Sequence, residues 1–268
     1  MHPILFTFPD WLPLVGGRSL HFYGFFIATG VLLGILWVRR EAKRLDIDVQ
    51  KIMDLYLNVF IAGLVGSRIL YIIHSVPNFW DDPLVLFRVW EGGLVFQGGV
   101  IGAVLVMIWL VRRYQLKFFQ IADVFVPALS LGHAFGRLGC FMAGCCHGKQ
   151  CDPDFLFAVR FPALPESIAP PHIPLYPTQL FEAGGEFLIF AFLIYFRKHK
   201  KFDGAVFLLY LILYSILRSI LEVYRGDMIR GFVIEPYVSN AQFLSILSII
   251  LAIGFWISLK RRSDKSGE

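Results

Sequence analysis

The segment from Gly132 to Lys149 holds the residues best suited to chemistry in this chain. It begins inside an apolar stretch, carries His133 and Arg137, and continues through glycines and cysteines into a polar loop. A guanidinium near the end of a membrane span is costly, and by default it marks a functional site with a partner elsewhere in the membrane. The glycines around it let a bulky ligand approach the backbone. We therefore expect the chemistry of the protein at this segment.

Arginine favours one kind of ligand, because a planar guanidinium matches phosphate through two parallel hydrogen bonds. Other polar residues are expected at the same depth as Arg137: Tyr23, Arg68, Gln97, His133, Glu182, Glu186, Arg218, Glu222, Arg225 and Gln242. This set holds more guanidinium than nearby carboxylate, which favours an anionic headgroup as ligand. The alternative is that opposite charges only neutralise one another and join helices. That interpretation stays open for Arg68 and Glu186.

The composition indicates that these groups lie in a membrane protein. The 268 residues are 57% hydrophobic and 17% charged, with a mean hydropathy of +0.64, whereas soluble domains hold about 45–50% apolar and about 25% charged residues. The net charge of +5 does not indicate nucleic-acid binding, because the basic residues cluster beside the apolar segments. No basic region precedes the first apolar residues, so we expect no secretory signal peptide. We expect a single integral membrane domain over residues 1–268.

Seven apolar segments are long enough to cross a bilayer, which takes about 20 helical residues. They cover residues 21–38, 52–73, 93–111, 118–141, 179–196, 205–223 and 238–259. Clusters of lysine and arginine follow the first, third, fifth and seventh segments, and such clusters stay in the cytoplasm. The opposite side carries acidic residues: Asp81, Asp82, Glu91, Asp152, Asp154, Glu166, Asp227 and Glu235. The sequence predicts an all-α membrane protein with seven transmembrane helices, its N-terminus outside and its C-terminus cytoplasmic. A re-entrant first segment would break this alternation.

The predicted direction of the spans places the polar residues in one layer near the outer leaflet, at about 1.5 Å of rise per residue. A transporter or channel more often needs polar groups through the full depth. A single layer suits an enzyme that draws lipid from one leaflet. A transporter or flippase for an anionic lipid or small anion remains the alternative, because Gly92-Gly93 and Gly98-Gly99 suggest a broken helix.

Seven short motifs, taken in order, resemble one known family. They are His21-Phe-Tyr-Gly24, Gly66-Ser-Arg-Ile69, Leu86-Phe-Arg-Val-Trp-Glu-Gly-Gly93, Gly98-Gly-Val-Ile-Gly102, Gly136-Arg-Leu-Gly139, Tyr176-Pro-Thr-Gln-Leu-Phe-Glu182 and Leu217-Arg-Ser-Ile-Leu-Glu-Val-Tyr-Arg225. Their order and spacing are similar to those of prolipoprotein diacylglyceryl transferases, over residues 20 to 260. The resemblance implies a seven-span enzyme of the bacterial plasma (inner) membrane with its active site toward the outer leaflet.

The resemblance also implies the reaction. Such enzymes move the diacylglyceryl group of phosphatidylglycerol onto the lipobox cysteine in the signal peptide of a preprolipoprotein. A thioether forms and glycerol 1-phosphate leaves, in the first step of lipoprotein maturation, and no cofactor or metal is needed. By this resemblance Arg137 holds the lipid phosphate, Arg218 faces it, and Glu222 orients one of the two. The further positions that shape the substrate site are Tyr23, Arg68, Gln97, Asp123, Gly148, Glu182 and Arg225.

Two departures from the family pattern lie at the centre of the site. Gln97 stands where many members have a histidine assigned as the base that activates the thiol, and an amide cannot take a proton at neutral pH. After Arg137, two asparagines and a glutamate of the usual signature become Cys140, Ala143 and Cys145. Either another group supplies the base or the chain has altered chemistry. The candidate bases are His133, ranked first because it shares a helical face with Arg137, His147 and Glu222. A catalytically inactive relative that binds lipoprotein precursors is a further alternative.

All four cysteines lie between residues 140 and 151, as Cys140, Cys145, Cys146 and Cys151. Three interpretations stay open: disulfides that clamp the loop, a metal site, or small buried apolar side chains. The spacing lacks the paired pattern of common structural zinc sites, and the outer face permits disulfides. A proline-rich segment follows, and we expect residues 142–178 to form a small outer-face head between the fourth and fifth spans that guides the peptide substrate.

Overall fold

The computed structural model of this chain describes residues 3–11, 16–76, 79, 82–88, 93–164, 167–226, 231–235 and 237–266. Asp81, Glu91, Gly92, Glu166 and Asp227, which entered the sequence argument, lie outside these residues. The chain divides into two compact units, one of Met1–Leu36 with Val126–Glu268 and one of Trp37–Phe125. Each unit is described separately below.

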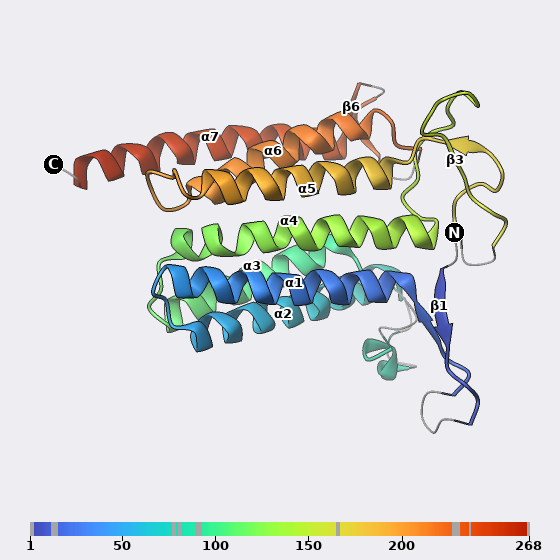
Figure 1. Cartoon of the computed structure of the whole chain (residues 1–268), viewed down its shortest axis with the longest axis horizontal. Helices are drawn as coiled ribbons and strands as arrows, with labels where there is room; N and C mark the ends of the chain where they lie inside the picture. The colour runs from blue at the N-terminus through green and yellow to red at the C-terminus, as the bar shows by residue number, and fades with distance from the viewer. Residues whose placement is uncertain are drawn as a thin grey trace. The chain divides into compact units, whose positions relative to one another are not determined.

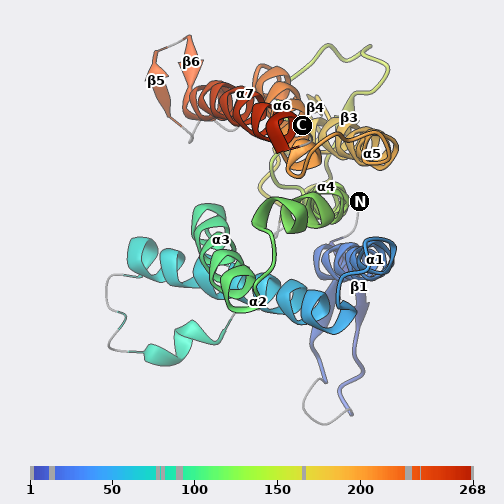
Figure 2. The same cartoon turned by 90° about the vertical axis from the view of Figure 1, so that its left-hand side faces the viewer.

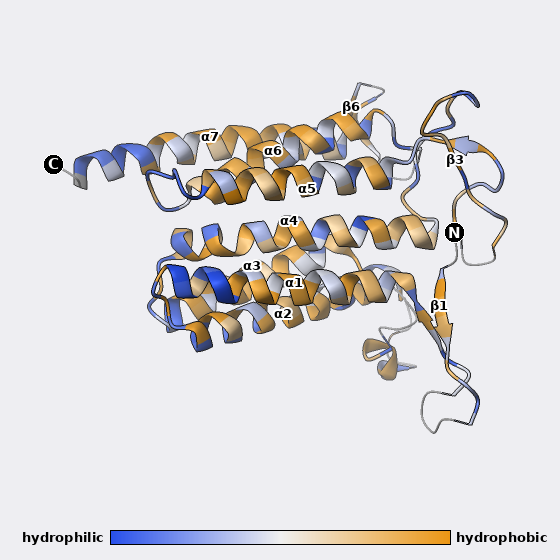
Figure 3. Cartoon of the chain, viewed as in Figure 1, coloured by the Kyte–Doolittle hydropathy of each residue, from blue (hydrophilic) through white to orange (hydrophobic). Residues whose placement is uncertain are grey.

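Among the described residues, seven helices are long and apolar enough to cross a membrane, as predicted. They are α1 (Phe22–Arg44), α2 (Val49–Ser75), α3 (Phe96–Arg113), α4 (Phe118–Ala143), α5 (Thr178–Phe196), α6 (Ala205–Glu222) and α7 (Asn240–Ser266). The predicted ends of α1 and α7 were too early, because each helix continues beyond its apolar part into a basic, hydrophilic turn (Figure 3). Large apolar side chains on the helices remain exposed, for example Leu244 at 62% and Ile250 at 61%, as expected for surfaces that face lipid.

In the unit of Trp37–Phe125, glycines allow α2 and α3 to pack at close range. A Cβ atom on Gly98 would lie 2.3 Å from the carbonyl oxygen of Gly66, and one on Gly102 would lie 2.4 Å from that of Ala62. Small residues of this kind let helix backbones approach in membranes. Gly98 and Gly99 both lie inside α3, which is continuous from Phe96 to Arg113, so the helix break expected at these two glycines is wrong.

In the other unit, α6 packs against both α5 and α7 (Figures 1 and 2). The apolar core of this group is formed by Val126 of α4, Ile189 and Leu193 of α5, and Val206 and Tyr210 of α6. Contacts among these side chains determine which sides of α4, α5 and α6 face one another. The charged residues of the expected site lie on the same sides, further along the helices.

One short strand pair precedes α1, and two more lie between α4 and α5 and between α6 and α7; the sequence does not predict these strands. They are β1 (Ile4–Thr7) with β2 (Ser19–His21), β3 (Val159–Arg160) with β4 (Pro174–Leu175), and β5 (Phe232–Ile234) with β6 (Val238–Ser239), and a 3-10 turn, η2, covers Pro83–Leu86. Strands of two to four residues are too short for the alternation of apolar and polar residues that identifies a strand. The pair β3–β4 lies within the segment predicted as the head.

Candidate active site at the ends of α4, α5 and α6

Charged residues of α4 and α5 meet in two layers. His133 Nδ1 lies 2.7 Å from Glu186 Oε1, and Arg137 Nη2 lies 2.9 Å from Glu182 Oε1. The four-residue step from His133 to Arg137 matches the step back from Glu186 to Glu182, because consecutive spans run in opposite directions. The side chains of Glu182 and Glu186 are only 1% and 0% exposed, so their charges depend on these partners.

His133 connects the two layers. The Nε of Arg137 donates a hydrogen bond to Nε2 of His133 at 3.2 Å. A guanidinium can only donate, so Nε2 is the acceptor and Nδ1 carries the proton that faces Glu186. Ser130 Oγ donates to the other carboxylate oxygen of Glu186 at 2.6 Å. The imidazole is therefore held in one orientation between Glu186 and Arg137.

The end of α6 adds further charges. Arg218 Nη1 lies 2.6 Å from Glu222 Oε2, and Arg225 Nη1 lies 3.8 Å from Glu182 Oε2. Tyr214 packs its ring 5.3 Å from that of His133 and is within electrostatic range of both Arg137 and Arg218.

This cluster holds equal numbers of arginines and glutamates: Arg137, Arg218 and Arg225 against Glu182, Glu186 and Glu222. The sequence predicts more arginine than glutamate in this layer, but that count includes Arg68. Because Arg68 belongs to the other unit, this cluster has no surplus of arginine. The capacity for an anion comes instead from unused donors. In the part of the chain that the structure describes, Arg137 Nη1 and the Nε and Nη2 atoms of Arg218 make no hydrogen bond or ion pair with protein. Two guanidiniums, each fixed by one glutamate, thus keep donors for a phosphate.

The loop after α4 is fastened to the starts and ends of neighbouring helices. Gly148 N donates to Tyr176 O at 3.1 Å, and Lys149 N donates to Tyr224 O at 2.8 Å. A Cβ atom at Gly148 would lie only 2.4 Å from the carbonyl oxygen of Tyr176. Gly148, predicted to shape the substrate site, therefore lets the loop lie against these two backbone segments.

Three cysteines lie beside this cluster. The Sγ atoms of Cys140, Cys145 and Cys146 are all within 4.8 Å of one another, and all four cysteines of the chain are free thiols. Hydrogen bonds from Cys140 and Cys145, with the charges of Arg137 and Arg225, hold the pKa of the Cys146 thiol well below its usual range. His147 follows directly, with its Nδ1 3.0 Å from Gly148 O.

Comparison with known proteins shows which family the chain belongs to. Residues 9–258 match the prolipoprotein diacylglyceryl transferase family. The chain belongs to this family. It is 37% identical to a phosphatidylglycerol–prolipoprotein diacylglyceryl transferase of Salmonella choleraesuis, over 91% of each chain. It is 33% identical to that of Clostridium tetani, over 94% of this chain and 96% of the relative, and 33% identical to transferase 2 of Clostridium perfringens, over 87% and 89%.

Membership in the diacylglyceryl transferase family confirms the resemblance and makes the chain a multi-pass membrane enzyme. The family likeness covers nearly the whole chain, including every element of the cluster. The transporter and the inactive relative were the alternatives, and the family assignment favours neither.

Tyr23 of this transferase packs against the backbone of α4. A Cβ atom at Gly139 would lie 3.0 Å from the ring of Tyr23, so the glycine makes room for it. Tyr23 is within electrostatic range of Arg137 and of the three clustered cysteines. The structure thus brings the tyrosine to the same place as the charged residues predicted from sequence.

Arg68, Gln97 and Asp123 belong to the other unit, so no contact with the cluster is assigned to them. Arg68 is buried, and its guanidinium donates to the carbonyl oxygens of Val85 at 2.5 Å and Arg88 at 2.9 Å. These bonds favour a role in holding the segment between α2 and α3. The sequence leaves open an acidic side chain as the partner of Arg68, whereas these contacts are to backbone carbonyls.

The sequence points less clearly to Glu186, Ser130 and Tyr214 than to the arginines. It leaves a helix-joining role open for Glu186, and it gives no prediction for Ser130 or Tyr214. A signal for Glu186 was present, because two residues four apart on one span facing two residues four apart on the next predict a matched pair of contacts. Ser130 and Tyr214 carry no such signal, since a serine or tyrosine on an apolar helix is common.

Proposed function

We propose that this enzyme transfers the diacylglyceryl group of phosphatidylglycerol to the lipobox cysteine of a preprolipoprotein at the cluster formed by Arg137, Glu182, Arg218 and Glu222. The observation that carries the proposal is the pair of arginines with unused donors in a buried, charge-balanced site. The relatives' names supply the substrates, since they name phosphatidylglycerol and prolipoprotein.

The reaction requires stabilisation of a leaving phosphate. The thiol sulfur forms a bond to the glycerol carbon, the bond between that carbon and the phosphate oxygen breaks, and the oxygen keeps the electron pair. Glycerol 1-phosphate thus carries more negative charge than the phosphodiester did. The N–H donors of Arg137 and Arg218 are fixed before the reaction, so they stabilise this charge without reorganising. Removing one such donor typically lowers the rate by about 10²–10³.

His133 acts in this proposal as a positioning residue for Arg137. Its Nε2 lone pair accepts the hydrogen bond from Arg137 Nε, and its Nδ1 lies 2.7 Å from Glu186 Oε1. To take a proton from the thiol, His133 would have to release Arg137. This geometry favours orientation of the guanidinium over the general-base role that the sequence suggested.

We place the site toward the outer leaflet of the bacterial plasma membrane. Basic residues occupy the last turns of α1, with Lys43 and Arg44, and of α3, with Arg112 and Arg113. These ends are expected in the cytoplasm. The loops after α4 and α6, which border the cluster, then lie on the outer side, where a lipoprotein precursor presents its cysteine.

The test is a transfer assay with the purified full-length protein, phosphatidylglycerol vesicles and a lipobox peptide, followed by mass spectrometry of the peptide. A gain of one diacylglyceryl unit, absent from a peptide whose cysteine is replaced by serine, is expected. No gain under conditions in which a histidine-containing family member is active would overturn the proposal and favour a binding role.

A further inference from the structure

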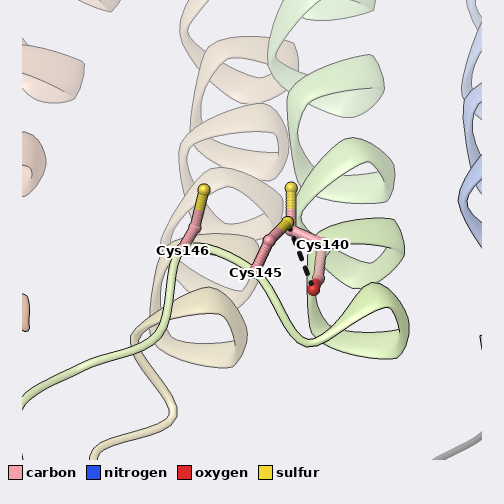
Figure 4. Close-up of side chains that lie close together, drawn as sticks. All are labelled: Cys140, Cys145 and Cys146. Atoms are coloured by element: carbon pink, nitrogen blue, oxygen red, sulfur yellow. Dashed lines mark hydrogen bonds between the residues drawn. The ribbon is translucent and has the colours of Figure 1, made fainter. Parts of the chain in front are cut away.

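The transfer chemistry proposed above uses the arginines but leaves three cysteines unexplained. Cys140 lies in the last turn of α4, and Cys145 and Cys146 lie in the loop that follows. Their side chains gather on one side of that loop (Figure 4), with all three Sγ atoms within 4.8 Å of one another. Cys151 is buried and is not part of this group.

The backbone holds the three cysteines in place. Cys145 N donates to Cys140 O at 3.1 Å, so the loop turns back onto the helix end. Gln179 Nε2 donates to Cys145 O at 2.7 Å, and Thr178 Oγ1 donates to Cys146 O at 3.1 Å. Both donors are buried side chains in the first turn of α5. The peptide groups that carry the thiols are thus anchored to a second helix.

The geometry matches a metal ion with three sulfur ligands. A zinc–sulfur bond of about 2.3 Å in tetrahedral geometry sets two sulfurs about 3.8 Å apart. Sulfurs already within 4.8 Å of one another reach that spacing through small side-chain rotations. Three protein ligands leave the fourth position open, which is the arrangement of catalytic rather than structural zinc sites.

The surrounding charge also suits such a site. Three thiolates and one Zn²⁺ carry a net charge of −1, and Arg137 and Arg225 both act electrostatically on Cys146. The ion would lie beside the guanidinium that is proposed to hold the lipid phosphate. A fourth ligand of this ion would therefore lie close to the proposed site of the lipid phosphate.

We propose that Cys140, Cys145 and Cys146 bind one zinc ion as thiolates, and that the lipobox cysteine of the substrate occupies its fourth position. This inference rests on the proposed function. It explains two departures of the sequence together, since the cysteines replace other signature residues while Gln97 cannot act as a base. A metal that binds the thiolate directly removes the need for that base, because a coordinating thiol is deprotonated outright.

The step balances without an oxidant. The substrate thiol displaces a water ligand and loses its proton to solvent. The zinc-bound sulfur then donates an electron pair to the glycerol carbon, and the carbon–oxygen bond breaks with its pair on the phosphate oxygen near Arg137. The thioether, a weaker ligand than a thiolate, leaves the zinc, and the metal does not change its oxidation state.

The experiment uses the full-length protein in detergent, with bound metal removed by a chelator and thiols kept reduced. Titration with Co²⁺ is expected to give one ion per chain, with a sulfur-to-cobalt charge-transfer band and the visible bands of tetrahedral cobalt. C140S, C145S and C146S should each weaken Co²⁺ binding at least tenfold, whereas C151S should bind as the wild type does. The lipobox peptide should shift the visible bands, and its Cys→Ser form should leave them unchanged.

Several outcomes would overturn the inference. One is the absence of a charge-transfer band in the reduced wild-type protein, a result that does not depend on any variant folding. Another is full transferase activity after chelation or in a C140S/C145S/C146S protein, which would overturn the inference while leaving the proposed function intact. Conversely, cobalt binding with a peptide-induced shift, but no transfer by the zinc-loaded protein, would support the site and count against the proposed function.

Discussion

Replacing Glu182 by Gln is expected to lower transfer by acting through Arg137. Glu182 is buried, contacts Arg137 Nη2 at 2.9 Å, and is the only carboxylate within ion-pair distance of Arg137 among the described residues. A polar contact to a charged group contributes about 1.5–3 kcal/mol. If this ion pair aligns the guanidinium for the phosphate, E182Q should lower kcat/KM by about 10- to 150-fold.

A double-mutant cycle tests whether the loss passes through Arg137. R137K keeps the positive charge but loses the bond to His133 and the two-pronged contact with phosphate, so we expect a fall of about 10²–10⁴. Once Arg137 is replaced, its alignment by Glu182 no longer matters. The E182Q/R137K protein should therefore be no more than about threefold worse than R137K, which corresponds to a coupling energy of about 1–3 kcal/mol.

Glu222 offers the matched control, because it pairs with Arg218 and has no contact with Arg137 among those described. In the E222Q/R137K double variant, the fold losses in kcat/KM of the two single variants should multiply. In the E182Q/R137K double variant they should not. Initial rates come from peptide mass spectrometry, with each variant checked for its melting temperature in detergent. If E182Q and R137K multiply their losses as E222Q and R137K do, Glu182 does not align Arg137 and the reasoning is wrong.

Three other substitutions, one of them with a control substitution, test separate parts of the structure. R137A should abolish transfer while leaving membrane insertion and the elution volume of the purified protein unchanged; an active R137A enzyme would remove the phosphate-binding role. G148A should lower the melting temperature by an amount equivalent to about 1–3 kcal/mol, because its Cβ would meet the Tyr176 carbonyl. The control is G254A, whose Cβ would meet nothing within 4 Å and which should be neutral or slightly stabilising. Equal effects of the two substitutions on the melting temperature would contradict the loop contact. The hydrogen bond to Asp54 raises the pKa of Tyr114 above its ordinary value of about 10, so this bond stabilises the fold at lower pH and is lost as pH rises through the raised pKa. An absorbance titration of D54N should therefore show one tyrosine ionising at lower pH than in the wild type, and identical titration curves would exclude the interaction.

The helices and the location of the candidate site could be predicted from sequence because both depend on strong local signals. Seven apolar segments separated by basic and acidic loops define the spans, and rare charges within them, such as Arg137 and Glu182, point to the candidate site. The ends of α1 and α7 were less predictable. A hydrophilic segment after an apolar one can either continue the helix or form a loop, so the length of the apolar segment does not fix where the helix ends.

The partners of each charge could not be predicted, because they depend on helix rotation and tilt. The sequence suggested that Glu222 orients one of the arginines, and the ion pair with Arg218 is consistent with this suggestion. It did not show that Glu182 lies between Arg137 and Arg225, or that the imidazole of His133 bonds to Arg137. The gathering of three thiols was also unpredictable, since the turn between Cys140 and Cys145 brings their sulfurs together and spacing alone does not.

The matched contacts between α4 and α5 have a consequence for the synthesis of the protein. Glu182 follows Arg137 by 45 residues in the chain, so at about 5–20 residues per second the arginine is made about 2–9 s before its partner. An unpaired arginine within a span costs up to about 3.5 kcal/mol on insertion. We expect α4 and α5 to leave the translocation channel together as a hairpin. A chain truncated after α4 should then be extracted from membranes by alkaline carbonate more readily than one truncated after α5.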